Sequence, residues 1–273
     1  MSDFLKSIID RAAQGEELTF SSVGDGEPLV MVNPEGVTTL DVEGDAQVVL
    51  LYQKSSEDSE VEFNISKGVK ASVVVLFLGS SKSKIDVNVG QDAVCNVTAF
   101  DVAGADSTYN ISLNERGGDA ELNILQLTTA ADHSVANAVI SHNASDCTSR
   151  SMGKCVASGD SVGEFHGMVY VAKDAQRTSS EQNSRNIQLS PSAKIVAEPQ
   201  LEIYADDVKC THGATVGQMN DEAIFYMMQR GLSRDLAQKL HLEGFVADIV
   251  NRCSIAEFVE ELKVMVEERL HKI

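Results

Sequence analysis

Apolar and polar residues alternate strictly over several stretches of the chain, as they do in strands with one buried face. The clearest stretches are residues 61–65, 85–89, 109–113 and 122–124. Aspartates typical of turns recur between them at a near-constant interval of 13 or 14: Asp92, Asp106, Asp119, Asp132, Asp146, Asp160 and Asp174. Asparagine recurs at the same interval, at Asn96, Asn110, Asn123 and Asn137. This period predicts a stack of strand-and-turn units, each burying its apolar side only against its neighbours.

Two architectures are compatible with this period. One is an antiparallel meander, in which each strand pairs with the next. The other is a flattened parallel β-helix, in which two units make one coil and each strand pairs with the unit two along. Signals for tight hairpins are scarce, because no Asn-Gly occurs and the one Asp-Gly, at Asp25–Gly26, precedes the repeats. We therefore predict a mainly β protein with a parallel β-helix over residues 37–218, in which the half-coil repeats at the aspartate interval.

Helical periodicity flanks the predicted β-helix on both sides. Residues 1–36 are interpreted as a short N-terminal helix and a lead-in, with an apolar face formed by Phe4, Leu5, Ile8, Ile9 and Ala12. Residues 219–273 are interpreted as a helical segment. The pattern thus predicts an all-β part followed by an all-α part.

Within the C-terminal segment, Asn220 is expected to cap a helix that Gly231 ends. Ser233 opens a second helix ending near Gly244, followed by a short helical piece. Residues 254–257 match a capping box that starts the last helix. Its expected inward residues are Ile255, Phe258, Val259, Leu262, Val266 and Leu270.

Composition excludes several functional classes. Lys and Arg number 22 against 41 Asp and Glu, a net charge of −19 that disfavours nucleic-acid binding. No apolar run approaches the roughly 20 residues that span a bilayer, and the N-terminus lacks the apolar core of a signal peptide. Five irregularly spaced cysteines suit a reducing compartment, so we expect a cytoplasmic protein that binds neither membrane nor nucleic acid. No P-loop motif is present, so we expect no nucleotide bound by this chain.

The main candidate for metal chemistry is the pair Cys210 and His212. Residues two apart on a strand share a face, so a thiol and an imidazole there could bind one soft metal. The alternative is a buried cysteine beside a histidine bonded to the backbone. Cys147 and Cys155, near Arg150 and Lys154, are further candidates for a reactive or metal-binding role, with small buried thiols as the alternative.

The segment Gln200–Gly217, with its run Asp-Asp-Val-Lys-Cys-Thr-His-Gly-Ala-Thr, closely resembles the SufB/SufD family of iron–sulfur cluster assembly proteins, and its SufD branch in particular. Residues 221–226, 229–231, 186–190 and 197–200 also fit the family. The resemblance in motifs is confined to this part of the chain. The preceding part resembles the family only in its repeats.

The resemblance implies a right-handed parallel β-helix and a non-catalytic scaffold subunit rather than an enzyme. It implies a SufC-type ATPase bound through the C-terminal helices, from about residue 220 to 273. It also implies a second SufB/SufD-type subunit, identical or paralogous, at the C-terminal end of the β-helix. His212 matches the family's functional histidine and Cys210 is its neighbour, so iron or a transient iron–sulfur cluster is the implied cargo.

The chain departs from the family pattern in three places. It is expected to be a short form without the family's usual N-terminal helical domain. The SufB-type block Glu-His-Glu-Ala-Thr is matched here by residues 211–215, with Gly213 in place of a glutamate. The SufB-type cysteine on a preceding strand has no counterpart, because Ser184 and Asn186 occupy that region. A partner chain is therefore expected to supply much of the ligation of any cluster.

Two other functions are compatible with a β-helix. One is a metal-free homodimeric interaction module. The other is an enzyme acting on polysaccharide, which needs carboxylates and a basic residue together on one sheet face. The outward positions of the predicted strands are mostly Asn, Ser and Thr, which argues against the enzyme.

Overall fold

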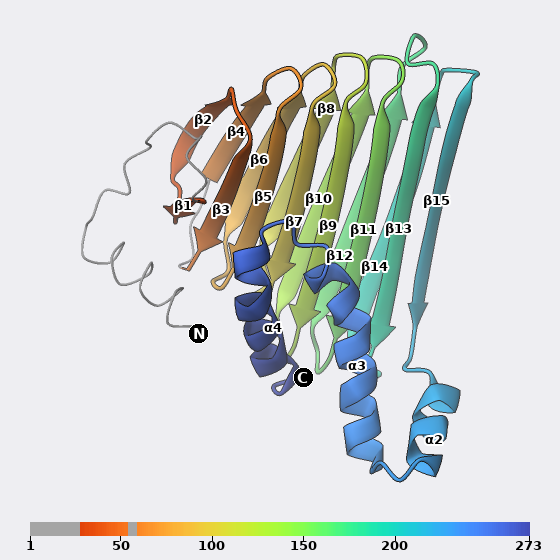
Figure 1. Ribbon diagram of the computed structural model, residues 1–273. Helices are drawn as coiled ribbons and strands as arrows, with labels where there is room; N and C mark the ends of the chain where they lie inside the picture. Colours follow the sequence, from red (N-terminus) through yellow and green to blue (C-terminus); the bar gives the residue numbers. More distant parts are fainter. Residues whose placement is uncertain (1–27, 54–58) are drawn as a thin grey trace.

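The computed structural model describes residues 28–53 and 59–273, without the side chains of Glu257 and Glu261. The predicted N-terminal helix with Phe4 and Ile8 lies outside these residues. The described chain contains fifteen strands followed by helices α2 (Asp221–Gln229), α3 (Arg234–Val250) and α4 (Ala256–Leu270) (Figure 1). The strands are β1 (Leu29–Val32), β2 (Gly36–Val42), β3 (Ala46–Tyr52), β4 (Ser59–Ile65), β5 (Lys70–Phe77), β6 (Lys82–Val89), β7 (Val94–Asp101), β8 (Asp106–Leu113), β9 (Asp119–Thr128), β10 (His133–His142), β11 (Thr148–Ala157), β12 (Val162–Val171), β13 (Thr178–Gln188), β14 (Lys194–Ile203) and β15 (Val208–Gly217).

The strands form two parallel sheets that confirm the β-helix and exclude the meander. Odd-numbered strands make an eight-stranded sheet in the order β1 to β15, here called sheet A, and even-numbered strands make a seven-stranded sheet B. Each strand pairs in parallel with the strand two along, so one coil contains one strand from each sheet. Strand β1 pairs with β3 and precedes residue 37, where the sequence placed the start of the β-helix.

The interior between the two sheets is filled by stacked apolar side chains. Because parallel strands pair in register, each inner residue lies on the equivalent residue of the next coil. Phe63 and Ile85 from sheet B and Phe77 from sheet A are fully buried members of this core. We call this interior the lumen of the β-helix.

The outer faces of the two sheets differ because the helices cover only one of them. Strands of sheet B alternate between buried and partly exposed residues, as β6 and β8 illustrate. Strands β3, β5 and β7 are buried on both faces, since α3 and α4 lie against sheet A (Figure 1). Phe258, Leu262 and Val266 of α4 pack there with Leu76 and Phe100 of the sheet.

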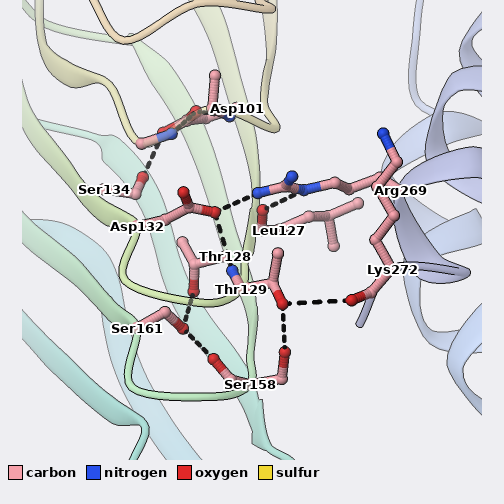
Figure 2. Close-up of polar contacts among 12 residues, drawn as sticks. Asp101, Leu127, Thr128, Thr129, Asp132, Ser134, Ser158, Ser161, Arg269 and Lys272 are labelled. Atoms are coloured by element: carbon pink, nitrogen blue, oxygen red, sulfur yellow. Dashed lines mark hydrogen bonds and ion pairs between the residues drawn. The ribbon is translucent and has the colours of Figure 1, made fainter.

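Polar contacts hold the helices at defined places on sheet A. The side chain of Arg269 at the end of α4 donates to the Asp132 carboxylate and to the carbonyl of Leu127, 3.2 Å away (Figure 2). Under α3, the nearly buried Lys154 ammonium donates to the Phe245 carbonyl at 2.7 Å and pairs with Asp248 at 2.9 Å. These contacts fix the helical segment relative to the coils.

The structure confirms the first C-terminal helix and corrects the next two. Asn220 caps α2, and Gly231 follows it with φ of 93°. Helix α3 does not end near Gly244 but runs to Val250, because an isolated glycine lowers helix propensity without breaking a helix that packs on a sheet. Helix α4 begins one residue later than predicted: the residue at its N-cap is the buried Ile255 and not Ser254, and Ile255 makes no side-chain cap.

The predicted asparagine series does not form a ladder. Asn96 pairs in register with Glu121, and Asn123 pairs with Thr98, so the two asparagines are offset by two positions along the paired strands. Asn96 and Asn123 are farther apart in the sequence than two residues that pair between β7 and β9. The ladder that exists lies on the outer face of sheet B, where Asn88 donates to Asn64 at 2.9 Å and Asn64 donates to Asp41 at 2.9 Å.

Candidate metal site

The last coil of the β-helix is open to solvent. Strands β14 and β15 end their sheets, and no described strand pairs with their outer edges. Positions that would be buried in an inner coil are exposed here: Ile203 on β14 is 38% exposed and Val216 on β15 is 46% exposed. The last coil therefore forms a mouth to the lumen, bordered by two unpaired strand edges.

Cys210 and His212 both occupy the inner face of β15 at this mouth. Cys210 lies on buried Ser180 of the coil below, and His212 lies on buried Gln182. Cys210 is half-buried and packs against the lumen core, whereas His212 is exposed. Burial raises the pKa of the Cys210 thiol, and the backbone N–H of Ser180 offsets part of that rise. The predicted pair is thus brought onto one face.

The imidazole of His212 crosses the mouth from sheet A to sheet B. Its Nδ1 lies 2.9 Å from the carbonyl oxygen of Pro199 on β14. A carbonyl only accepts, so Nδ1 must carry a proton, and in the neutral imidazole Nε2 then keeps its lone pair. A histidine whose other nitrogen donates to a backbone carbonyl is the usual arrangement of a metal ligand.

This chain offers two metal donors at the mouth. In the described residues, no group of three or more His, Cys, Asp or Glu side chains is arranged to hold a metal ion. A thiol and an imidazole fit iron in an iron–sulfur environment, but iron needs about four ligands. Cys210 and His212 therefore fit two of the ligand positions that an iron site needs.

Polar residues continue below the pair into the lumen. The Ser180 hydroxyl bonds to Ser149 at 2.8 Å, and Ser149 bonds to Nε2 of the buried His142 at 2.8 Å. Desolvation lowers the pKa of His142 to about 4. Next to this column, Gln182 lies on Ser151 of β11.

Sequence reasoning missed these two columns, although a signal for them exists. Ser149 and Ser151, Ser180 and Gln182, and Cys210 and His212 are polar pairs with the same spacing of two, and they follow one another at nearly equal intervals. Their recurrence marks one inner face over three successive coils.

The other sequence candidates do not form a reactive or metal site. Cys147 and Cys155 are both buried. Burial raises the pKa of Cys147, and it raises the pKa of Cys155 to about 12, so both thiols stay protonated near neutral pH. Ser184 and Asn186 lie on the inner face of β13, where the Asn186 amide donates to Ser184 at 2.9 Å and to the Thr215 carbonyl at 3.0 Å. Here both side chains have structural partners.

The outer face of sheet B carries more charge than the prediction of mostly Asn, Ser and Thr. Lys84 pairs with Glu60 at 2.8 Å and with Asp86 at 2.7 Å. Farther along, His166 contacts Glu164 and Glu198, each at 3.0 Å. The prediction was wrong for these strands, because the outward positions of β4, β6 and β12 include Glu60, Lys84, Asp86, Glu164 and His166. These carboxylates bond to neighbouring side chains on the same face.

The helical segment presents a second exposed surface. Helix α2 packs against α3 and leaves Phe225 and Tyr226 about 60% exposed. Leu236 and Leu240 of α3 are 43% and 41% exposed. Large apolar side chains exposed on two packed helices are typical of protein contact surfaces. Among the described helices, none is both long and apolar enough to cross a membrane.

Comparison with known proteins gives consistent results. Residues 35–245 match the family model described as SUF system FeS cluster assembly, SufBD core domain. The iron–sulfur cluster assembly protein SufD of Escherichia coli is 32% identical over 187 residues, which cover 68% of this chain and 44% of the relative. A SufBD family protein of Synechocystis is 31% identical over 60% of this chain and 36% of its own length. One of Mycobacterium leprae is 27% identical over 83% of this chain and 62% of its own length. The chain thus spans about half the length of these relatives.

Proposed function

Because the chain belongs to the SufB/SufD family of iron–sulfur cluster assembly proteins and is SufD-like, we propose that it is a scaffold subunit of a SUF-type assembly complex and not an enzyme. The observation that carries this proposal is the position of Cys210 and His212 side by side at the open mouth of the β-helix. Iron or a nascent cluster is the cargo held there.

A second SufB/SufD-type subunit covers the mouth and completes the site. Two observations support this. The edges of β14 and β15 have no described strand beside them, and an unpaired edge is a ready template for another chain. Ile203, Tyr204 and Val216 add exposed apolar surface at the same end. Since this chain contributes two donors, the remaining ligands come from the second subunit, identical or paralogous.

A SufC-type ATPase binds the helical segment. The apolar surface on α2 and α3 supplies a contact area, and this chain has no P-loop of its own. Nucleotide binding by the partner would then favour one of two arrangements of the subunits. An ATPase acts on the mouth only if it binds those arrangements with different affinities. Opening the interface would expose Cys210 and His212 for loading or release.

The proposal is tested by replacing His212 with alanine in cells that depend on this chain. The imidazole is exposed and bonds to one carbonyl, so His212→Ala should fold normally while activity of iron–sulfur enzymes falls to the level of the deletion strain. His133→Ala is the matched control, since His133 is an exposed histidine on the outer face of sheet B. Normal cluster maturation with His212→Ala would overturn the site.

The metal-free interaction module is separated from this function by iron content. We expect the chain purified with its cellular partners to contain iron and to absorb visible light. Cys210→Ala and His212→Ala should lower both signals. A complex that assembles fully and never contains iron would favour the interaction module instead.

A further inference from the structure

Gln182 is a buried carboxamide whose polar atoms have no partner. Its side chain is on the inner face of β13 and is 0% exposed. Neither Oε1 nor Nε2 has a hydrogen-bond partner in the part of the chain that the structure describes. An unpaired buried polar group costs about 1–3 kcal/mol, so a glutamine at this position needs an explanation other than stability.

The side chain lies one level below the candidate metal site. Gln182 pairs in register with His212, and neighbouring strands are about 4.8 Å apart. It extends across the lumen toward β12, because a Cβ placed on Gly167 would come within 2.5 Å of Gln182 Nε2. Gly167 in turn pairs with Pro199, whose carbonyl accepts from His212. Gln182 and His212 therefore cross the lumen at adjacent levels, between the same two stacks of residues.

A second buried glutamine in the lumen shows what a structural role looks like. Gln126 on β9 is 2% exposed, and its Nε2 donates to Ser134 Oγ at 2.8 Å and to the Glu164 carbonyl at 3.0 Å. The Gln126 carboxamide therefore has hydrogen-bond partners, whereas the Gln182 carboxamide has none in the described residues. Below Gln182, the hydroxyl of Ser151 is also unpaired. Gln182 and Ser151 therefore form an unpaired column directly beneath the mouth, while other unpaired buried groups, such as Ser83 Oγ and Tyr109 Oη, lie in earlier coils.

We propose that Gln182 is a positioning residue that donates a hydrogen bond to the sulfur-bearing group held by Cys210 and His212. The inference rests on the proposed function of that pair. Hydrogen bonds from amide groups to thiolate or sulfide stabilise negative charge on sulfur, and such contacts around a metal site orient and strengthen its ligands. Cys210 lies diagonally above Gln182, a separation that a long side chain spans.

The test measures Co²⁺ binding to the complex of the full chain with its second subunit, with Co²⁺ alone as the probe and its thiolate charge-transfer absorption as the signal. Thermal stability is measured on the full chain by itself. Gln182→Met keeps the volume and removes the polar atoms. We expect it to raise the melting temperature, weaken Co²⁺ binding about 10- to 100-fold and shift the charge-transfer band. Gln126→Met is the matched control, and it should lower the melting temperature while leaving Co²⁺ affinity unchanged.

The outcomes separate this inference from the function on which it rests. If Co²⁺ binds the wild type, fails to bind His212→Ala and binds Gln182→Met with unchanged affinity and spectrum, the role of Gln182 is overturned and the site stands. If Co²⁺ binds the wild type and His212→Ala equally, or neither, both ideas fall. A Gln182→Met variant with a lower melting temperature and unchanged Co²⁺ affinity would make Gln182 a structural residue.

Discussion

The two halves of the lumen are built alike and filled differently. Along one column of sheet A, the inner residues of the earlier coils are Val73, Val97 and Leu122, all fully buried hydrophobic residues. The same column continues in the later coils as Ser151, Gln182 and His212. The change occurs between β9 and β11 with no break in strand pairing, so the backbone of the coil does not require it.

The neighbouring column changes at the same coil. Ala71, Cys95 and Ala120 are followed by Ser149, Ser180 and Cys210. Apolar burial contributes about 25 cal/mol per Å², whereas a buried hydroxyl contributes little even when it is bonded. The apolar coils therefore supply most of the stability of the stack. The polar coils beneath the mouth contribute less free energy of apolar burial, and they lie next to the proposed metal site.

The largest difference should be in thiol reactivity, since Cys95 and Cys210 lie in opposite halves of one column. Cys95 is fully buried and burial raises its pKa to about 12, whereas Cys210 is partly exposed. We expect an aromatic disulfide reagent to label Cys210 at least about 1,000-fold faster, because Cys95 reacts only through opening of the stack. Cys210→Ala should remove the fast phase. A wild type without a fast phase would show that the mouth is closed, and a fast phase that survives in Cys210→Ala would show that another thiol is accessible.

Core substitutions compare the two halves energetically. Leu122→Ala should lower the free energy of unfolding by about 2–5 kcal/mol, since it leaves a cavity among fully buried residues. Ser151→Ala, one coil along the same column, should change it by less than about 1 kcal/mol, because the Ser151 hydroxyl has no partner to lose. Urea denaturation measures both. Equal losses of unfolding free energy in the two variants would contradict the proposed difference between apolar and polar coils.

Acid should weaken the polar half through His142. Its pKa is about 4 when folded, and the unfolded value is 6.5. The unfolded chain therefore takes up the proton first, so the stabilisation is complete above about pH 6.5 and is lost as the pH falls toward 4. The loss reaches roughly 3 kcal/mol at pH 4. His142→Gln should flatten this part of the pH dependence measured by urea denaturation, and a curve identical to the wild type would contradict the buried neutral histidine.

The smallest effect is expected on the outer face of sheet B, from His166. Its two ring nitrogens contact Glu164 and Glu198, with His133 on the other oxygen of Glu164. Hydrogen bonds to these carboxylates, first to Glu164, raise the pKa of His166. The stabilisation is therefore present below the unfolded pKa and is lost as the pH rises through the folded value. At this partly exposed pair it should stay below about 1 kcal/mol, and His166→Gln should remove it. A larger loss of stability in His166→Gln would mean that the outer face of sheet B is shielded from solvent.

The fold was predictable because its period is regular. Strand length, turn spacing and the scarcity of hairpin signals were enough to choose parallel pairing two units apart. The register was not predictable from the same spacing, because the step between paired strands varies along the stack: it is shorter from Thr98 to Asn123 than from Ser151 to Gln182. A prediction based on a uniform period therefore placed the asparagines of neighbouring coils in register when they are offset.

The site was predictable in part for the same reason. Cys210 and His212 share a face because they are two positions apart on one strand, which is a local property. The contacts of His212 with Pro199 and of Gln182 with Gly167 join different sheets across the lumen, and no local pattern encodes them. The end of α3 was missed because packing on sheet A outweighs the low helix propensity of Gly244.

X-ray absorption at the iron edge, on the chain purified with its cellular partners, tests the central claim most directly. We expect sulfur and nitrogen scatterers around iron in the wild type. Cys210→Ala should lower the sulfur scattering and His212→Ala should lower the nitrogen scattering. An iron environment of oxygen ligands alone, or one that is the same in all three proteins, would contradict a site at the mouth of the β-helix.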